Sequence, residues 1–222
     1  MPNEQLFAVT LAVTDQAIAQ GIPIPDELDA AVTLTAKTQR SYERALMQTV
    51  EDRYNGETSD DEFLALMALL IAYQLRRAMR DGMREVGWRG DVPNDMENEF
   101  ALMEMEEEQY TRSLLSDILI AIAAGVGIAV LRSRMKMWAN RYMDVRNRAM
   151  VLVGKRTGAL LRWDFGGTEK HCTDCAGYNG TVRTAEEWDD LYRMQGHKPQ
   201  SRELECKGYN CDCSLNVVRG KG

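Results

Sequence analysis

The chain has 222 residues, which is enough for one sizeable domain or two small ones. Its apolar fraction of 45% and charged fraction of 27% are typical of a folded, water-soluble protein, and the net charge of −7 excludes a surface that is basic throughout. The first residues lack the basic segment of a signal peptide, so we expect synthesis in a reducing cytosol.

The charge is unevenly distributed along the chain. Residues 132–162 hold nine Lys or Arg against one acid, Asp144, a net charge of +8. Residues 1–131 carry −13 and residues 164–222 carry −2. This segregation indicates that different segments face different partners.

Helical patterns dominate the first part of the chain. The apolar stretch from Asn3 to Gln20 predicts one helix, and a second is expected from Pro25 to about Tyr54. Ser59 and Glu62 form a capping-box motif that begins a third helix. One stripe of that helix is apolar, comprising Phe63, Leu64, Met67, Leu70, Ile71 and Leu75.

After a loop at residues 87–94, the helical pattern continues from Asp95 to about Trp163. This is too long for one ordinary globular helix. Interior glycine weakens a helix, so Gly125 and Gly127 are the expected site of a break or kink. Near the end of the chain, a capping box predicts a short helix from Thr184 to Met194.

We therefore predict a mainly α protein containing a long helix or helical hairpin. Its helical body spans residues 1–163, with an apolar segment at 114–131 and a basic stretch at 132–162. Residues 164–222 form a small, loop-rich module that we expect to resemble a zinc ribbon.

All five cysteines lie in this module, as Cys172-x-x-Cys175 and Cys206-x4-Cys211-x-Cys213. A structural zinc ion takes about four ligands in a tetrahedron and can hold together a module with a small core. We predict Cys172, Cys175 and Cys206 as ligands, with either Cys211 or Cys213 as the fourth. Side chains alternate along an extended chain, so one of the last two should face away.

Alternatives to this zinc site remain open. His197 is a weaker candidate ligand, and His171 adjoins Cys172. The cysteines can instead be free thiols, or disulfides formed late in an oxidising setting. A catalytic zinc is disfavoured because no neighbouring general base is evident, and no other enzyme motif is present, so we predict that the protein is not an enzyme.

Over residues 138–216, the chain resembles the C-terminal module of phage head morphogenesis proteins of the Mu F type, minor capsid proteins associated with the portal. The matching positions are Trp163, Cys172, Cys175, Gly180, Pro199, Cys211, Cys213 and Leu215. A subset of the family is closer still and also matches Gln200, Ser201, Leu204, Cys206 and Gly208. Two positions depart from the usual pattern: Cys206 replaces a histidine and Asp212 replaces an arginine.

The resemblance implies a minor structural protein of a tailed-phage virion, made in the bacterial cytoplasm and located in the head at the portal vertex. It would act by protein–protein binding, with the portal protein, the major capsid protein or both as partners, and as a homo-oligomer. Its zinc would be structural.

The uncharged run from Ile118 to Leu131 has 14 residues, whereas a membrane-spanning helix needs about 20. Ala121, Gly125 and Ala129 recur every four residues and allow close helix packing. We expect a helix buried in a bundle or between subunits. The alternative hypothesis is an internal ejection protein whose apolar helix inserts into the host membrane, with transient membrane contact through Ile118–Leu131.

The basic stretch suggests contact with packaged DNA through Arg132, Arg134, Lys136 and Arg141, because Lys and Arg pair with phosphates. A third hypothesis is accordingly a zinc-module protein that binds nucleic acid. The competing interpretation is that the basic residues pair with the seven acids of Asp95–Glu108 across an antiparallel hairpin.

Overall fold

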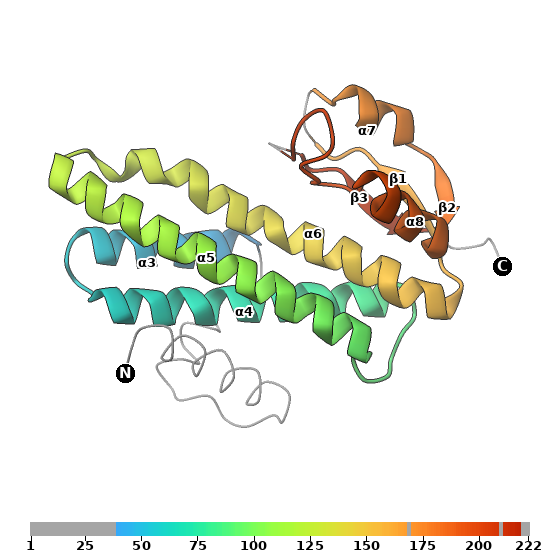
Figure 1. Ribbon diagram of the computed structural model, residues 1–222, viewed down its shortest axis with the longest axis horizontal. Helices are drawn as coiled ribbons and strands as arrows, with labels where there is room; N and C mark the ends of the chain where they lie inside the picture. Colours follow the sequence, from blue (N-terminus) through green and yellow to red (C-terminus); the bar gives the residue numbers. More distant parts are fainter. Residues whose placement is uncertain (1–38, 168–169, 209–210, 219–222) are drawn as a thin grey trace. The chain divides into compact units, whose positions relative to one another are not determined.

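The computed structural model describes residues 39–167, 170–208 and 211–218 (Figure 1). As predicted, the chain is mainly helical, with a small sheet and many loops near its C-terminal end. The elements are α3 (Gln39–Tyr54), α4 (Asp60–Glu85), α5 (Asn94–Ala124), the 3₁₀ helix η1 (Ile128–Leu131), α6 (Arg132–Thr157), β1 (Leu160–Asp164), α7 (Thr173–Tyr178), β2 (Val182–Thr184), α8 (Ala185–Gln195) and β3 (Ser214–Val217).

The predicted helix boundaries are confirmed at the start of α4. The Ser59 amide and hydroxyl both donate to the Glu62 carboxylate at 2.8 Å, and the Glu62 amide donates to Ser59 Oγ at 3.3 Å. The helix before it ends at Tyr54, as expected. The helix predicted at Asn3–Gln20 and the first part of the one predicted from Pro25 lie outside the described residues.

The break predicted at Gly125 and Gly127 is also confirmed. α5 ends at Ala124, and Gly125 adopts a φ of +63°, a conformation that glycine takes without strain. η1 and α6 follow, so the chain forms a helical hairpin. An ion pair between Arg134 and Asp117 joins its two arms near the tip.

The apolar run 118–131 is therefore divided between the end of α5, a turn and η1. Within the described part of the chain, no helix combines the length and the apolar character needed to cross a bilayer. The expectation of a buried helix holds only in part, because Ile118 and Ala121 are buried whereas Ile120 is exposed.

The helix expected to continue to Trp163 is a wrong prediction. α6 ends at Thr157, and Gly158 follows with a φ of +67°, the left-handed conformation common just after helices. Leu160–Asp164 forms β1 instead, with Leu161 and Trp163 buried and Leu160 and Arg162 exposed. This alternation has the period of a strand, and pairing on both sides of β1 stabilises it.

The chain forms two compact units. The first comprises residues 1–76, as far as they are described, together with residues 99–139; the second comprises residues 77–98 and 140–222. Whether the cysteine module is a domain separate from residues 1–163 stays a prediction. The apolar stripe predicted on α4 is buried in the first unit, at Phe63, Leu64, Met67, Leu70, Ile71 and Leu75.

In the second unit, a small antiparallel sheet carries the aromatic core of the cysteine module. Its strand order is β2-β1-β3, with Trp163 opposite Leu215. The ring of Trp163 lies 5.0 Å from that of Tyr178 and 5.7 Å from that of Trp188. Trp188 Nε1 also donates to the carbonyl oxygen of Leu161 at 2.9 Å, which ties α8 to β1.

A buried charge cluster joins α6 to α8 in the same unit. The carboxylate of Asp189 is buried and lies 2.6 Å from Arg148 Nη1 and 2.6 Å from Lys155 Nζ. The more exposed Arg193 lies 3.0 Å away. Burial raises the pKa of Asp189, but Lys155 and Arg148 outweigh that effect and hold the pKa below its ordinary value.

Replacing Asp189 with Asn should lower the free energy of unfolding by about 3–5 kcal/mol, because it leaves a buried Arg148 without its charge partner. Arg193→Ala is the matched control and should cost less than about 1 kcal/mol, since its side chain is 62% exposed. Urea unfolding at pH 7 measures both. Because the pKa of Asp189 is depressed, its carboxylate stabilises the fold at pH values above its ordinary pKa. This stabilisation disappears as the pH falls through the lowered pKa. Equal losses in the two variants would contradict this assignment.

Candidate metal centre

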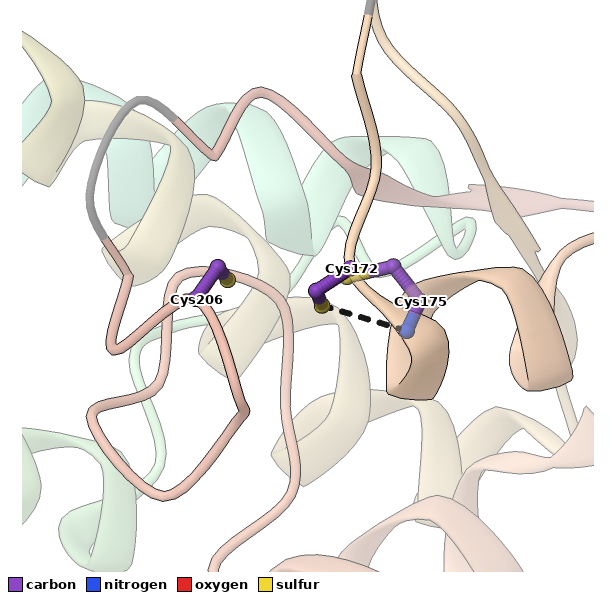
Figure 2. Close-up of side chains that lie close together, drawn as sticks. All are labelled: Cys172, Cys175 and Cys206. Carbon is purple, nitrogen blue, oxygen red and sulfur yellow. Dashed lines mark hydrogen bonds between the residues drawn. The ribbon is translucent and has the colours of Figure 1, made fainter.

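The first two cysteines lie at the start of α7 (Figure 2). Cys172 is the residue that caps the helix, and its Sγ accepts a hydrogen bond from the Cys175 amide at 3.4 Å. Amide donors at a helix N-terminus stabilise a thiolate. The spacing of Cys172-x-x-Cys175 thus places both sulfurs on one side of the first helical turn.

Cys206 lies on a tight turn that faces this helix end (Figure 2). The turn is closed by a hydrogen bond of 2.7 Å from the Lys207 amide to the Leu204 carbonyl oxygen. Gly208 follows with a φ of +73°, and a Cβ atom there would overlap the backbone oxygen of Gln200. Both the conformation and the space require glycine at this position.

Two carboxylates tie the Cys206 turn to the start of α7. The Thr173 amide donates to Glu205 Oε2 at 2.8 Å, and the Glu205 amide donates to Asp174 Oδ2 at 2.7 Å. Charge-assisted bonds of this kind are stronger than those between neutral groups. The sequence did not predict these roles, because nothing in the spacing of Asp174 and Glu205 links residues 31 positions apart.

Cys211 and Cys213 both turn towards Cys175, so the prediction that one of them faces away is wrong. The three sulfurs lie within 4.8 Å of one another, and all three residues are buried. The alternation argument fails because residues 211–213 precede the strand, which begins only at Ser214.

The side chain of Gln200 shapes this segment. Its Nε2 donates to the carbonyl oxygens of Cys211, at 3.3 Å, and of Cys213. Its Oε1 accepts from Asn147 Nδ2 at 3.3 Å, and Asn147 Oδ1 accepts from the Leu215 amide at 3.1 Å. Asn147 of α6 therefore holds Gln200, and Gln200 in turn positions Cys211 and Cys213. This is the physical role of the glutamine in Pro199-Gln200-Ser201.

The sulfurs of Cys172, Cys175 and Cys206 form a second group within 4.8 Å of one another. Cys175 belongs to both groups, so the sulfurs of all five cysteines gather around it. All five are free thiols. Clustered thiols with these separations can hold a metal ion. Which four act as ligands stays a prediction.

The cluster affects the acidity of its thiols. Burial opposes ionisation of Cys172, but hydrogen bonds from the Cys175 and Cys206 segments leave its pKa below the ordinary value. Burial is the largest cause that raises the pKa of Cys206 to about 11, and it raises the pKa of Cys175 further. A hydrogen bond with Cys213, followed by burial, raises the pKa of Cys211.

The two histidines occupy different surroundings. His197, the weaker candidate ligand, has its Nδ1 2.9 Å from the Tyr178 hydroxyl and belongs to none of the metal-ligand groups found among the described residues. His171 Nδ1 lies 3.8 Å from Cys213 Sγ. His171 therefore lies next to the cysteine cluster.

The residues predicted to contact DNA are partly engaged with the chain's own acids. Arg134 pairs with Asp117, and Arg141 lies 2.6 Å from Asp144. Arg132 is exposed, and the side chain of Lys136 lies outside the described residues. The expected pairing with the acidic segment is found for Arg156, which lies 2.8 Å from Asp95.

No family model matches the chain, and comparisons with curated proteins and with solved structures give no match either. The resemblance to phage head proteins consequently stays a prediction from the motif residues.

Metal binding should tighten as the pH rises. The raised pKa values mean that Cys175, Cys206 and Cys211 carry protons at pH 7 before metal binds, and a metal ion must displace them. The apparent affinity for Zn²⁺ should therefore increase roughly tenfold per pH unit for each proton displaced, measured between pH 6 and 8 by competition with a chromophoric chelator. Cys206→Ser should bind more weakly with a shallower slope. An affinity independent of pH would contradict thiolate ligation.

Proposed function

We propose that this protein is a minor structural protein of a tailed-phage virion that acts by protein–protein binding at the portal vertex of the head. The helical body supplies contacts to the portal protein, to the major capsid protein or to further copies of the chain. The cysteine module is held together by one structural zinc ion with four cysteine ligands. The protein is not an enzyme.

The convergence of the cysteines is the single observation that carries this proposal. The residues shared with the Mu F type include Cys172, Cys175, Cys211 and Cys213, which are separated by up to 41 positions in sequence yet have sulfurs that all approach Cys175. If these thiols lay far apart on the surface, the shared cysteines could not form one metal site, and the resemblance would lose its physical basis. Gln200 and Gly208, also shared with the closer subset, support the same cluster.

The pairing of the basic stretch favours protein binding over DNA binding. Arg146 pairs with Glu85, Arg148 with Asp189 and Arg156 with Asp95, in addition to the pairs made by Arg134 and Arg141. A base already neutralised by a neighbouring acid releases few counterions on meeting phosphate. These pairs therefore argue against an extended DNA-binding surface.

Purified particles of the phage that encodes this chain should contain it in several copies per head, detectable by mass spectrometry. Phage carrying Cys172→Ser and Cys175→Ser should lose the protein from the particles, because the module unfolds without these two zinc ligands. The matched control is Arg193→Ala, which should leave incorporation unchanged. Particles of the unaltered phage that lack the chain altogether would refute the structural role.

A second candidate function is favoured by one observation at the tip of the hairpin. Ile120 and Val130 are 62% and 56% exposed, and Val126 is also exposed. Together with Asp117 and Arg134, these residues line a groove of about 270 Å³. An exposed apolar tip suits an ejection protein that touches the host membrane during infection.

Flotation with anionic liposomes separates this candidate from the structural role. A protein that acts only through protein contacts should stay at the bottom of the gradient, and this is the result we expect. If the chain floats, Ile120→Ser with Val130→Ser should abolish flotation, because both changes remove exposed apolar surface from the tip. The control is Leu102→Ser, an exposed residue of α5 well before the tip.

A further inference from the structure

A third group of possible ligands lies beside the cysteine cluster, and two of its members, His171 and Asp212, have no role in the zinc centre proposed above. His171 Nδ1, an Asp212 carboxylate oxygen and Cys213 Sγ lie within 4.8 Å of one another. Cys213 is buried, whereas His171 and Asp212 are half-buried. The group therefore sits where the interior of the module meets solvent.

The separations suit a single shared ion. A Zn²⁺ ion about 2.3 Å from a sulfur and about 2.0–2.1 Å from a nitrogen in a tetrahedron holds these two atoms about 3.5 Å apart. The observed separation between His171 Nδ1 and Cys213 Sγ is 3.8 Å. A small movement of either side chain brings both atoms into ligand distance.

The surroundings hold two of the three ligands in place. The His171 ring stacks on Phe165, with ring centroids 3.7 Å apart and planes inclined by 10°. Asp212 lies against Gly166, where a Cβ atom would overlap both its carboxylate carbon and its backbone oxygen. Glycine at position 166 therefore leaves room for Asp212, and the stacking fixes the plane of the imidazole.

Cys213 can serve this group without leaving the first centre short of a ligand, because the sulfur of Cys211 also lies within 4.8 Å of that of Cys175. Cys213, in contrast, is the cysteine that contacts His171. The five thiols then divide into four for the first centre and one for the second.

We propose that His171, Asp212 and Cys213 bind a second divalent transition-metal ion, with water in the fourth coordination position. Nitrogen, carboxylate and thiolate donors together suit Zn²⁺, and three protein ligands leave one position open to exchange. The proposal rests on the four-cysteine centre, because it needs Cys211 to complete that centre.

Metal counting on the full-length, tag-free protein tests the second site. After loading with Zn²⁺ and removal of excess ion, native mass spectrometry with elemental analysis should give two ions per chain. His171→Ala and Asp212→Asn should each give one. The matched controls are His197→Ala, which changes the other histidine of the chain, and Asp190→Asn, which changes an exposed carboxylate; both should keep two.

The outcomes are distinguishable. One ion in the unaltered protein, unchanged in His171→Ala, overturns the second site and leaves the first centre intact. No ion in the unaltered protein overturns both. Circular dichroism checks that each variant is folded, and Co²⁺ titration gives an independent readout: the first equivalent should give a tetrathiolate spectrum, and the second a distinct one that is lost in Asp212→Asn.

Discussion

The structure of the C-terminal module depends on the approach of distant cysteine thiols to Cys175. Ionising several buried thiols that lie close together costs free energy, because the thiolates lose hydration and repel one another. Without a metal ion the thiols therefore stay protonated. The raised pKa values of Cys206 and Cys211 express this cost. A metal ion bound by the thiolates would remove this cost and stabilise the module, because it would replace the protons and cross-link three separate segments of the chain.

The geometry of this cluster is set by residues that do not bear sulfur. Asp174 and Glu205 join the first two cysteine segments through backbone hydrogen bonds. Gln200, held by Asn147 of α6, positions the third segment. Because Asn147 belongs to α6 and Gln200 to a loop, their hydrogen bonds link the cysteine cluster to this helix. Outer partners of this kind orient ligands and tune metal affinity.

Charge pairing organises the remainder of the second unit. Asp189 neutralises Arg148 and Lys155, and Asp144 pairs with Arg141 and with Lys198, which lies 2.8 Å away. A stretch that is strongly basic in sequence is thus largely neutralised within the fold. Buried ion pairs add little net stability compared with apolar packing, but breaking one is costly, so they fix which surfaces meet. The ion pairs of Asp189 with Arg148 and Lys155 make this kind of contact between α6 and α8.

Local signals in the sequence determined the starts of α4 and α8 at the Ser59 and Thr184 capping boxes and the break at Gly125, because each depends on neighbouring residues. Cysteine spacing likewise identified the candidate ligands. The tertiary structure alone decided that Leu160–Asp164 is a strand, since the pairing that stabilises it comes from residues up to 56 positions away. It also decided that Cys211 and Cys213 both face Cys175 and that Asp212 lies beside His171. Those arrangements depend on contacts between distant segments, which periodicity and spacing do not encode.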